Sequence, residues 1–292
     1  MNIAIHDADG GKFPNLALRK LRAWHKIRGD HIELFNPLFK YDRIYSSKVF
    51  TFTEVDPYLH ESAVKGGIGY ELDENLPEEV EHTCPDYSGL DYSFGFLTRG
   101  CNRNCAWCVV PKKEGPIRAH AEIEEFARHR NVLLMDNNIL AHSHGIKQLE
   151  KIAHMPIRID LNQGVDAWLI DNGIARLFGK IRWWKPVRLA LDHSSQKRAI
   201  AKAVDLLRHN NVTPSRYSCY VLINNISDAL DRVEFLRSLN VDPFVQPFID
   251  RKGTPPPKEH KHFARWVNHK AIFRSCRWDE YRRRSVGLAS AA

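Results

Sequence analysis

The stretch Phe94-Gly-Phe-Leu-Thr-Arg-Gly-Cys101-Asn-Arg-Asn-Cys105-Ala-Trp-Cys108-Val-Val-Pro111 joins an apolar segment directly to a loop with three cysteines. The apolar segment, Phe94–Leu97, predicts a buried β-strand. The cysteines follow with the spacing C-x3-C-x2-C, so one loop at the end of a strand presents three thiols. This strand also begins the alternation of elements that decides the fold class.

Apolar segments recur after this strand, and helical patterns with apolar residues three and four positions apart fill the gaps. The predicted strands are Phe94–Leu97, Val132–Met135, Ile157–Leu161, Val187–Leu191, Tyr217–Ile223 and Phe244–Phe248. The predicted helices are Glu122–Arg130, Gly145–His154, Ala167–Phe178, Gln196–His209 and Asp228–Leu239. Repeated βα units predict an α/β fold with a parallel sheet. Six such units suffice for a partial (β/α)6 barrel, but not for a closed barrel of eight.

The residues before the barrel predict a small N-terminal α/β unit. Ile3–Ile5 and His31–Phe35 predict strands on either side of a helix over Asn15–Arg28, and Arg43–Val49 predicts a third strand. Residues 61–92 predict a connecting segment.

The last part of the chain predicts a basic helical extension. The run Gly253-Thr-Pro-Pro-Pro257 breaks any regular element, and a helix with Phe263 and Trp266 should then pack onto the barrel. The predicted division is an N-terminal unit with its linker (1–90), a barrel (91–250) and the extension (251–292).

Composition is that of a globular protein that buries a core, with 292 residues of which 43% are hydrophobic. No basic segment leads into a long apolar stretch at the N-terminus, and no apolar run approaches the ~20 residues that cross a bilayer. We therefore expect a cytoplasmic protein with no membrane contact. Disulfide frameworks belong mainly to short secreted chains, so the clustering of three of the six cysteines indicates a ligand loop instead.

The formal charge of +8 is concentrated near the C-terminus. Between Lys258 and Arg284 the sequence has nine Lys or Arg residues and three acidic ones. Cations beside Trp266, Trp278 and Tyr281 would suit unpaired bases of a nucleic acid. The alternative is a solvated helix face whose aromatic residues belong to the core.

Three thiolates from one loop are suited to an iron–sulfur cluster. Cys101, Cys105 and Cys108 can each bind one iron of a [4Fe–4S] cubane, which leaves the fourth iron without a protein ligand. A cluster that only carries electrons normally takes four cysteines. Three cysteines and a histidine could instead bind zinc, but zinc ligands usually come in pairs separated by a longer span.

The loop, with Trp107 as the aromatic residue of C-x3-C-x-aromatic-C, resembles the signature of the radical S-adenosylmethionine (SAM) superfamily. The resemblance implies that SAM binds the open iron and is cleaved reductively to a 5′-deoxyadenosyl radical, which abstracts hydrogen from a substrate. It also implies an electron donor such as flavodoxin or ferredoxin. It assigns no catalytic side chain in this chain.

The flanking residues are similar to those of the branch that contains methylthiotransferases and cobalamin-domain radical SAM enzymes. The similarity lies in Arg99-Gly100-Cys101, Val109-Val110-Pro111 and Glu114-Gly115. Cys84 is the sole cysteine before the loop, so the second cluster of methylthiotransferases is not expected. The turn Asp7-Ala-Asp-Gly-Gly11 lacks the histidine of cobalamin-binding domains. We therefore expect the N-terminal unit to be free of cofactor or to serve as a platform for the substrate.

In the superfamily, the ends of the barrel strands contact SAM. The resemblance places Asp136, with Asn137 and Asn138, beside the SAM amino group; the alternative is a strand-end turn. Further contacts are expected from the third and fourth strands, where alternate side chains point inward. Arg188 is the predicted partner of the SAM carboxylate, with an internal Asp–Arg ion pair as the alternative. The predicted cofactor-binding residues are Trp107, Asp136, Asn137, Asn138, Asp160, Asn162, Gln163, Arg188 and Asp192.

A non-catalytic iron–sulfur protein is the alternative function. It would transfer electrons or stabilise a nucleic-acid-binding fold. The expected position of the loop at the mouth of a barrel favours the enzyme.

Overall fold

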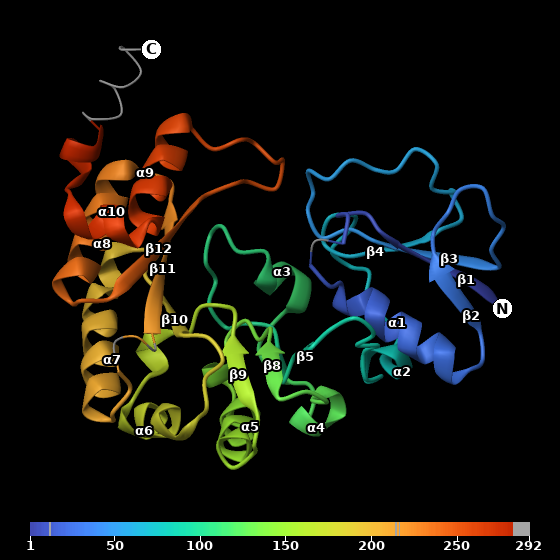
Figure 1. Cartoon of the computed structure of the whole chain (residues 1–292), viewed down its shortest axis with the longest axis horizontal. Helices are drawn as coiled ribbons and strands as arrows, with labels where there is room; N and C mark the ends of the chain where they lie inside the picture. The colour runs from blue at the N-terminus through green and yellow to red at the C-terminus, as the bar shows by residue number, and fades with distance from the viewer. Residues whose placement is uncertain (12, 214, 216, 283–292) are drawn as a thin grey trace. The chain divides into compact units, whose positions relative to one another are not determined.

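The computed structural model describes residues 1–11, 13–213, 215 and 217–282 (Figure 1). The chain is a mixed α/β protein whose larger sheets are parallel. It divides into two compact units, and the predicted boundaries at residues 90 and 250 stay predictions. The first unit comprises Met1–Gln148, Pro156–Arg158 and Arg251–Gly253, and the second comprises Leu149–Met155, Ile159–Asp250 and the residues from Thr254 on.

A parallel sheet of order β2-β1-β3-β4 opens the first unit. Its strands are β1 (Asn2–Asp7), β2 (His31–Leu34), β3 (Arg43–Ser47) and β4 (Val64–Gly66), and its helices are α1 (Leu16–Ile27) and α2 (Glu78–Glu81). The first three strands and α1 confirm the predictions. The strand β4 lies within the segment predicted as a connection, and its exposed residues carry no apolar pattern. Asn15 caps α1 by accepting a hydrogen bond from the backbone N–H of Leu18.

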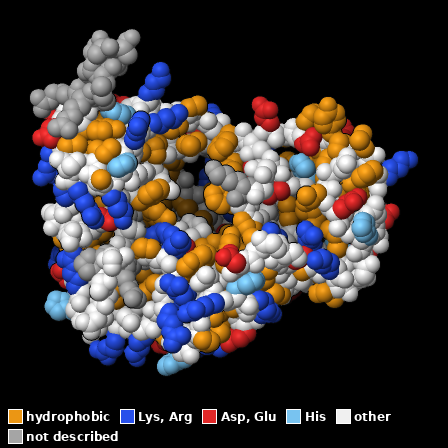
Figure 2. Space-filling view, viewed as in Figure 1, with side chains coloured by type: hydrophobic (Ala, Val, Ile, Leu, Met, Phe, Trp, Pro, Cys, Tyr) orange, Lys and Arg blue, Asp and Glu red, His pale blue; other side chains and the backbone are white. Residues whose placement is uncertain are grey.

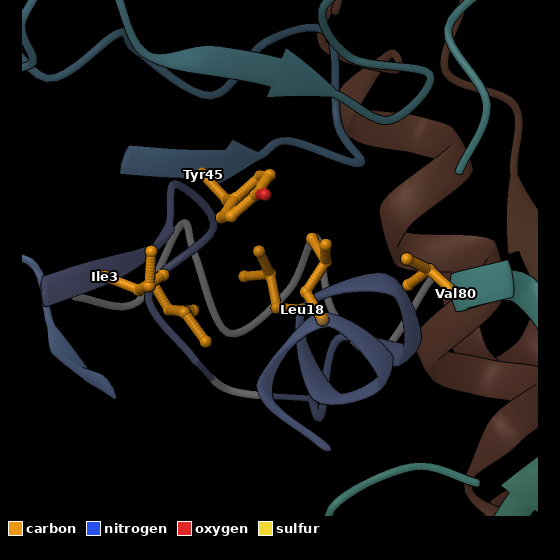
Figure 3. Close-up of a cluster of buried hydrophobic side chains, with 6 residues drawn as sticks. Ile3, Leu18, Tyr45 and Val80 are labelled. Carbon is orange, nitrogen blue, oxygen red and sulfur yellow. The ribbon is translucent and has the colours of Figure 1, made fainter. Parts of the chain in front are cut away.

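The apolar face of α1 and the strands of this sheet form one core (Figure 3). Full burial of one such aliphatic side chain stabilises the folded protein by about 1.5–3 kcal/mol relative to leaving the side chain exposed. The members of the core are Ile3, Ile5, Leu18, Leu21, Tyr45 and Val80.

The rest of the first unit carries the cysteine loop. Strand β5 (Tyr92–Gly95) pairs in parallel with β8 (Asn131–Leu134), and a short antiparallel pair, β6 (Thr98–Arg99) with β7 (Arg118–Ala119), follows β5. The other elements are α3 (Val110–Glu114), α4 (Ile123–Phe126), η1 (Ile139–Ala141) and α5 (Ser143–Ala153), whose residues from Leu149 on belong to the second unit.

The helix α4 is shorter than the helix predicted at Glu122–Arg130. The prediction was wrong for the second half of that range. The backbone N–H groups of Arg128 and His129 donate to the Ser93 hydroxyl at 2.8 and 3.1 Å instead of continuing the helix. A side chain that lies 35 residues away in the sequence therefore ends the helix.

The second unit contains a parallel sheet of order β10-β11-β12. Its strands are β10 (Val187–Ala190), β11 (Tyr217–Ile223) and β12 (Asp242–Pro247), and β9 (Arg158–Leu161) precedes them. Its helices are η2 (Ala167–Leu169), α6 (Asn172–Lys180), η3 (Ser194–Gln196), α7 (Lys197–His209), α8 (Ile226–Ser238), α9 (Lys258–Asn268) and α10 (Lys270–Ser275). The predicted helix Ala167–Phe178 is split because Asp171 caps a new helix.

Helix α9 packs on β12, as predicted for the helix after the proline run. The Asn268 side chain binds both the N–H and the C=O of Val245. The part of the predicted extension after Arg282 lies outside the described residues. Among the helices of the described ranges, none is both long and apolar enough to cross a lipid bilayer.

Candidate functional site

The cysteine loop is closed at its base by contacts within the protein. Strands β6 and β7 pair through Thr98 with Ala119 and Arg99 with Arg118, and the Cys101 N–H donates to the Gly115 carbonyl at 3.1 Å. The Arg99 guanidinium binds both oxygens of Glu114 at 2.7 and 2.6 Å. Such a bidentate pair fixes geometry as well as adding energy. Contacts within the protein therefore hold the two ends of the loop together.

The Arg99–Glu114 pair continues into a buried charge network that the sequence analysis missed. The Glu81 carboxylate lies 3.1 Å from Lys20, 3.2 Å from His120 and 3.6 Å from Arg99. Burial raises the pKa of Glu81, but these partners more than offset it and bring the pKa to about 2. The network holds the strand before the cysteines against α1 and α2. No local sequence pattern signals it, because its members come from distant segments.

The three loop cysteines differ in exposure and in their hydrogen-bond donors. Cys105 is exposed, whereas Cys101 and Cys108 are partly buried. The Arg103 N–H donates to the Cys101 sulfur at 3.3 Å, and the Val110 N–H donates to the Cys108 sulfur at 3.4 Å. Such donors stabilise negative charge on a thiolate ligand.

The donor set fits an iron–sulfur cluster in its chemistry. Three thiols stand on one closed loop, and amide N–H groups face two of the sulfurs. In the ranges that the structure describes, no three His, Cys, Asp or Glu side chains already converge as a metal site. Trp107, between the second and third cysteines, is 40% exposed.

Asp136, just after β8, is buried and holds the strand that enters the loop. Its carboxylate accepts hydrogen bonds from the Leu97 N–H at 3.1 Å, the Thr98 N–H at 2.5 Å and the Thr98 hydroxyl at 2.7 Å. The carboxylate therefore binds the backbone at the start of the cysteine loop, 38 and 39 residues earlier in the chain. Contact of Asp136 with SAM stays a prediction.

Stability should depend on the protonation of Asp136. Burial raises the pKa of this carboxyl to about 6, since desolvation outweighs the hydrogen bonds from Thr98 and Leu97. The pKa of an unfolded Asp is ~3.9, so the folded state binds the proton more tightly. This stabilising contribution is complete below pH ~4 and is lost as the pH rises through about 6.

We therefore expect the unfolding free energy of the wild type, relative to Asp136→Asn, to increase by roughly 2 kcal/mol from pH 7 to pH 4. Urea unfolding of the metal-free proteins at both pH values measures this difference. The comparison with Asp136→Asn cancels the titration of all other groups. A difference that stays constant with pH would mean that the carboxyl has an ordinary pKa.

Asn138 lies beside the cysteine loop and is nine-tenths buried. Its Nδ2 donates to the Cys101 sulfur at 3.6 Å. Within the described part of the chain, its Oδ1 is buried and has no hydrogen-bond partner. Asn137, in the same turn, is only partly buried. An unsatisfied buried acceptor is costly, so Asn138 Oδ1 is suited to a donor supplied by a ligand.

In the second unit, Arg188 of β10 and Asp160 of β9 form the internal ion pair that the sequence left open. Arg188 also donates to the Leu161 carbonyl at 2.9 Å. Asn162 follows β9, and its Oδ1 is a second buried acceptor without a partner among the described residues. Gln163 is exposed.

Asp192, after β10, repeats the arrangement of Asp136. Its carboxylate accepts the Leu222 N–H at 2.9 Å, and burial raises its pKa. The buried Arg232 donates to the carbonyls of Leu191 and Leu222, which ties the ends of β10 and β11 together. The contact of Asp192 with SAM stays a prediction.

The two tryptophans predicted to stack on nucleic acid, Trp266 and Trp278, belong to the core. Trp266 is fully buried and Trp278 is 4% exposed, so neither can stack on a nucleic acid base. Several nearby cations are paired with acidic side chains, as are Lys270 and Arg274 with Asp242. On the face that Figure 2 shows, Lys and Arg side chains lie in several separate groups. Tyr281 is partly exposed, and contact of this residue and of the cations with nucleic acid stays a prediction.

Comparison with known proteins yields a short match. A segment of 64 residues is 41% identical to the tRNA-2-methylthio-N(6)-dimethylallyladenosine synthase of Pelodictyon phaeoclathratiforme. The match covers 22% of this chain and 14% of that protein. That relative is a methylthiotransferase, from the branch that the cysteine loop resembles. No family model matches the chain.

Proposed function

We propose that this chain is a radical SAM enzyme with a [4Fe–4S] cluster on Cys101, Cys105 and Cys108. The observation that carries the proposal is the closed loop with three thiols, beside which Asn138 offers an unpartnered buried acceptor. The short match to a methylthiotransferase supports the same class. Strands β5 and β8 to β12 would then belong to one partial (β/α)6 barrel, with the N-terminal unit and the C-terminal extension attached.

The residues of this chain would hold SAM through polar groups at the strand ends. A reduced cluster supplies the electron that cleaves bound SAM, and the protein supplies orientation and exclusion of water. Asn138 Oδ1 is a better acceptor for the SAM ammonium than Asp136, whose oxygens already accept bonds from Leu97 and Thr98. Asn162 Oδ1 is a second acceptor, and Arg188 a donor for the carboxylate.

The proposed substrate class is nucleic acid, and the proposed electron donor is a flavodoxin or ferredoxin. The name of the matched relative refers to a tRNA nucleoside. The exposed cations of α9, among them Lys261 and Arg265, offer contacts to phosphates.

Replacement of Arg188 with Ala should weaken SAM binding by about 1.5–3 kcal/mol, the value of a hydrogen bond to a charged group. Iron content should not change. Arg188→Lys should recover only part of the affinity, because Lys lacks the planar fork. Equilibrium binding of SAM to the iron-loaded proteins measures the effect, with the exposed Arg198→Ala as a control of equal charge. Unchanged affinity would assign Arg188 solely to its ion pair with Asp160.

The decisive experiment tests for an open iron site. In anaerobically reconstituted protein, SAM should perturb the electron paramagnetic resonance spectrum of the dithionite-reduced cluster and should slowly yield 5′-deoxyadenosine. If the cluster is fully loaded and saturating SAM leaves its spectrum unchanged, the enzyme hypothesis is refuted and an electron carrier is favoured. Incubation with pooled deuterium-labelled nucleic acids then tests the substrate class. The measurement is the transfer of deuterium from the nucleic acid to 5′-deoxyadenosine.

A further inference from the structure

The turn that carries Asn138 is held rigidly from both sides. On one side, Asp136 binds the backbone of Leu97 and Thr98. On the other side, Ile139 is 3% exposed and packs so closely on α5 that a Cβ at Gly145 would lie 2.2 Å from the Ile139 carbonyl oxygen. The backbone of the turn that carries Asn138 is therefore fixed by the residues on either side of it.

The amide of Asn138 must present its nitrogen to the Cys101 sulfur. A thiolate accepts hydrogen bonds and donates none, so the opposite orientation would set oxygen against sulfur. The observed Nδ2 to Sγ distance is 3.6 Å. With the backbone N–H of Arg103 at 3.3 Å, Cys101 thus receives one backbone donor and one buried side-chain donor.

We infer that Asn138 is a positioning residue of the iron–sulfur site, and that its hydrogen bond to Cys101 raises the reduction potential of the cluster. The inference rests on the proposed function. Reduction adds negative charge to the cluster and its sulfur ligands, and a buried N–H donor stabilises that charge more than it stabilises the oxidised state. The donor also keeps Cys101 aimed at the cluster.

Two substitutions of similar size test this role. Asn138→Leu removes the donor, and Asn138→Asp replaces it with an acceptor. Redox titration without SAM, monitored by electron paramagnetic resonance, measures the reduction potential. For Asn138→Leu we expect about a tenfold lower ratio of reduced to oxidised cluster at a fixed potential, which corresponds to a reduction potential lower by ~59 mV for one electron. The shift should be larger for Asp. Asn104→Asp, an exposed position in the same loop, is the charge control and should shift the potential little because solvent screens it.

Each outcome decides the matter. Equal potentials for wild type, Leu and Asp at full iron loading would overturn the inference while leaving the proposed function intact. Failure of the wild type to bind a cluster would instead overturn the proposed function. If the Leu and Asp variants lose their iron, the smaller Asn138→Ala, which also lacks a donor, is titrated, and a wild-type potential in that variant would refute the tuning role. Loss of iron in all three variants would also refute it, and would leave a purely structural role.

Discussion

Replacement of Cys101, Cys105 or Cys108 with Ala should abolish the cluster, whereas the wild type should bind about four irons and four sulfides per chain. Each variant removes one of the three protein ligands of the cubane, and we expect that two thiolates do not retain the cluster. Iron and sulfide analysis after anaerobic reconstitution measures the effect. Because Arg99 and Glu114 close the base of the loop independently of metal, the variants should remain folded.

Two other cysteines serve as matched controls. Cys84 is partly buried and Cys276 is 7% exposed, and neither lies in the loop. Their Ala variants should retain full iron. Equal loss of iron in Cys276→Ala would instead identify a fourth protein ligand and favour the electron carrier. Stoichiometric zinc without iron after anaerobic purification would contradict the iron–sulfur assignment altogether.

Replacement of Gly100 with Ala should disrupt the cysteine loop nearly as severely as the loss of one of its cysteines. Gly100 has a φ of +87°, and a Cβ there would lie 2.3 Å from the Pro116 carbonyl oxygen and 2.7 Å from that of Gly115. The left-handed conformation costs ~1–2 kcal/mol for an L-residue, and the backbone clash adds ~1–3 kcal/mol. Since β6 and β7 must separate to relieve the clash, iron loading should fall together with stability. Thermal unfolding and iron analysis measure both effects.

Gly115 provides the control at the other end of the loop. Its φ is +72°, but a Cβ there would meet nothing within 4 Å. Its ψ of −157° places it in a backbone region that is essentially confined to glycine. Gly115→Ala should therefore incur the conformational cost alone, ~1–3 kcal/mol, and retain its iron. Equal loss of iron in the two variants would show that flexibility at the glycines matters, rather than close packing at Gly100.

The sequence predicted where the regular elements begin and end wherever a local pattern carried the signal. The strand predicted at Tyr217–Ile223 is β11, a short apolar run with β-branched and aromatic residues in which every second side chain is buried. The helix predicted at Gln196–His209 corresponds to η3 and α7, whose apolar stripe faces the core. The cysteine spacing likewise required no structure, since the ligands come from one loop.

The prediction failed where partners come from distant segments. Strand β4 has no apolar pattern and exists through its pairing with β3. The second half of α4 is lost to the Ser93 hydroxyl. Trp278 was one of the aromatic residues weighed as a stacking surface, yet tertiary packing buries it.

The sequence by itself thus determined the α/β class, most of the elements and the three thiols on one loop. Only the tertiary structure decided the roles of the polar residues at the strand ends. Asp136 and Asn138 lie two positions apart after the same strand, yet one binds the backbone of Thr98 and the other faces Cys101. Their partners lie 38 and 37 residues earlier in the chain. Hydrogen bonds of this kind depend on the register of neighbouring strands, which no local pattern specifies.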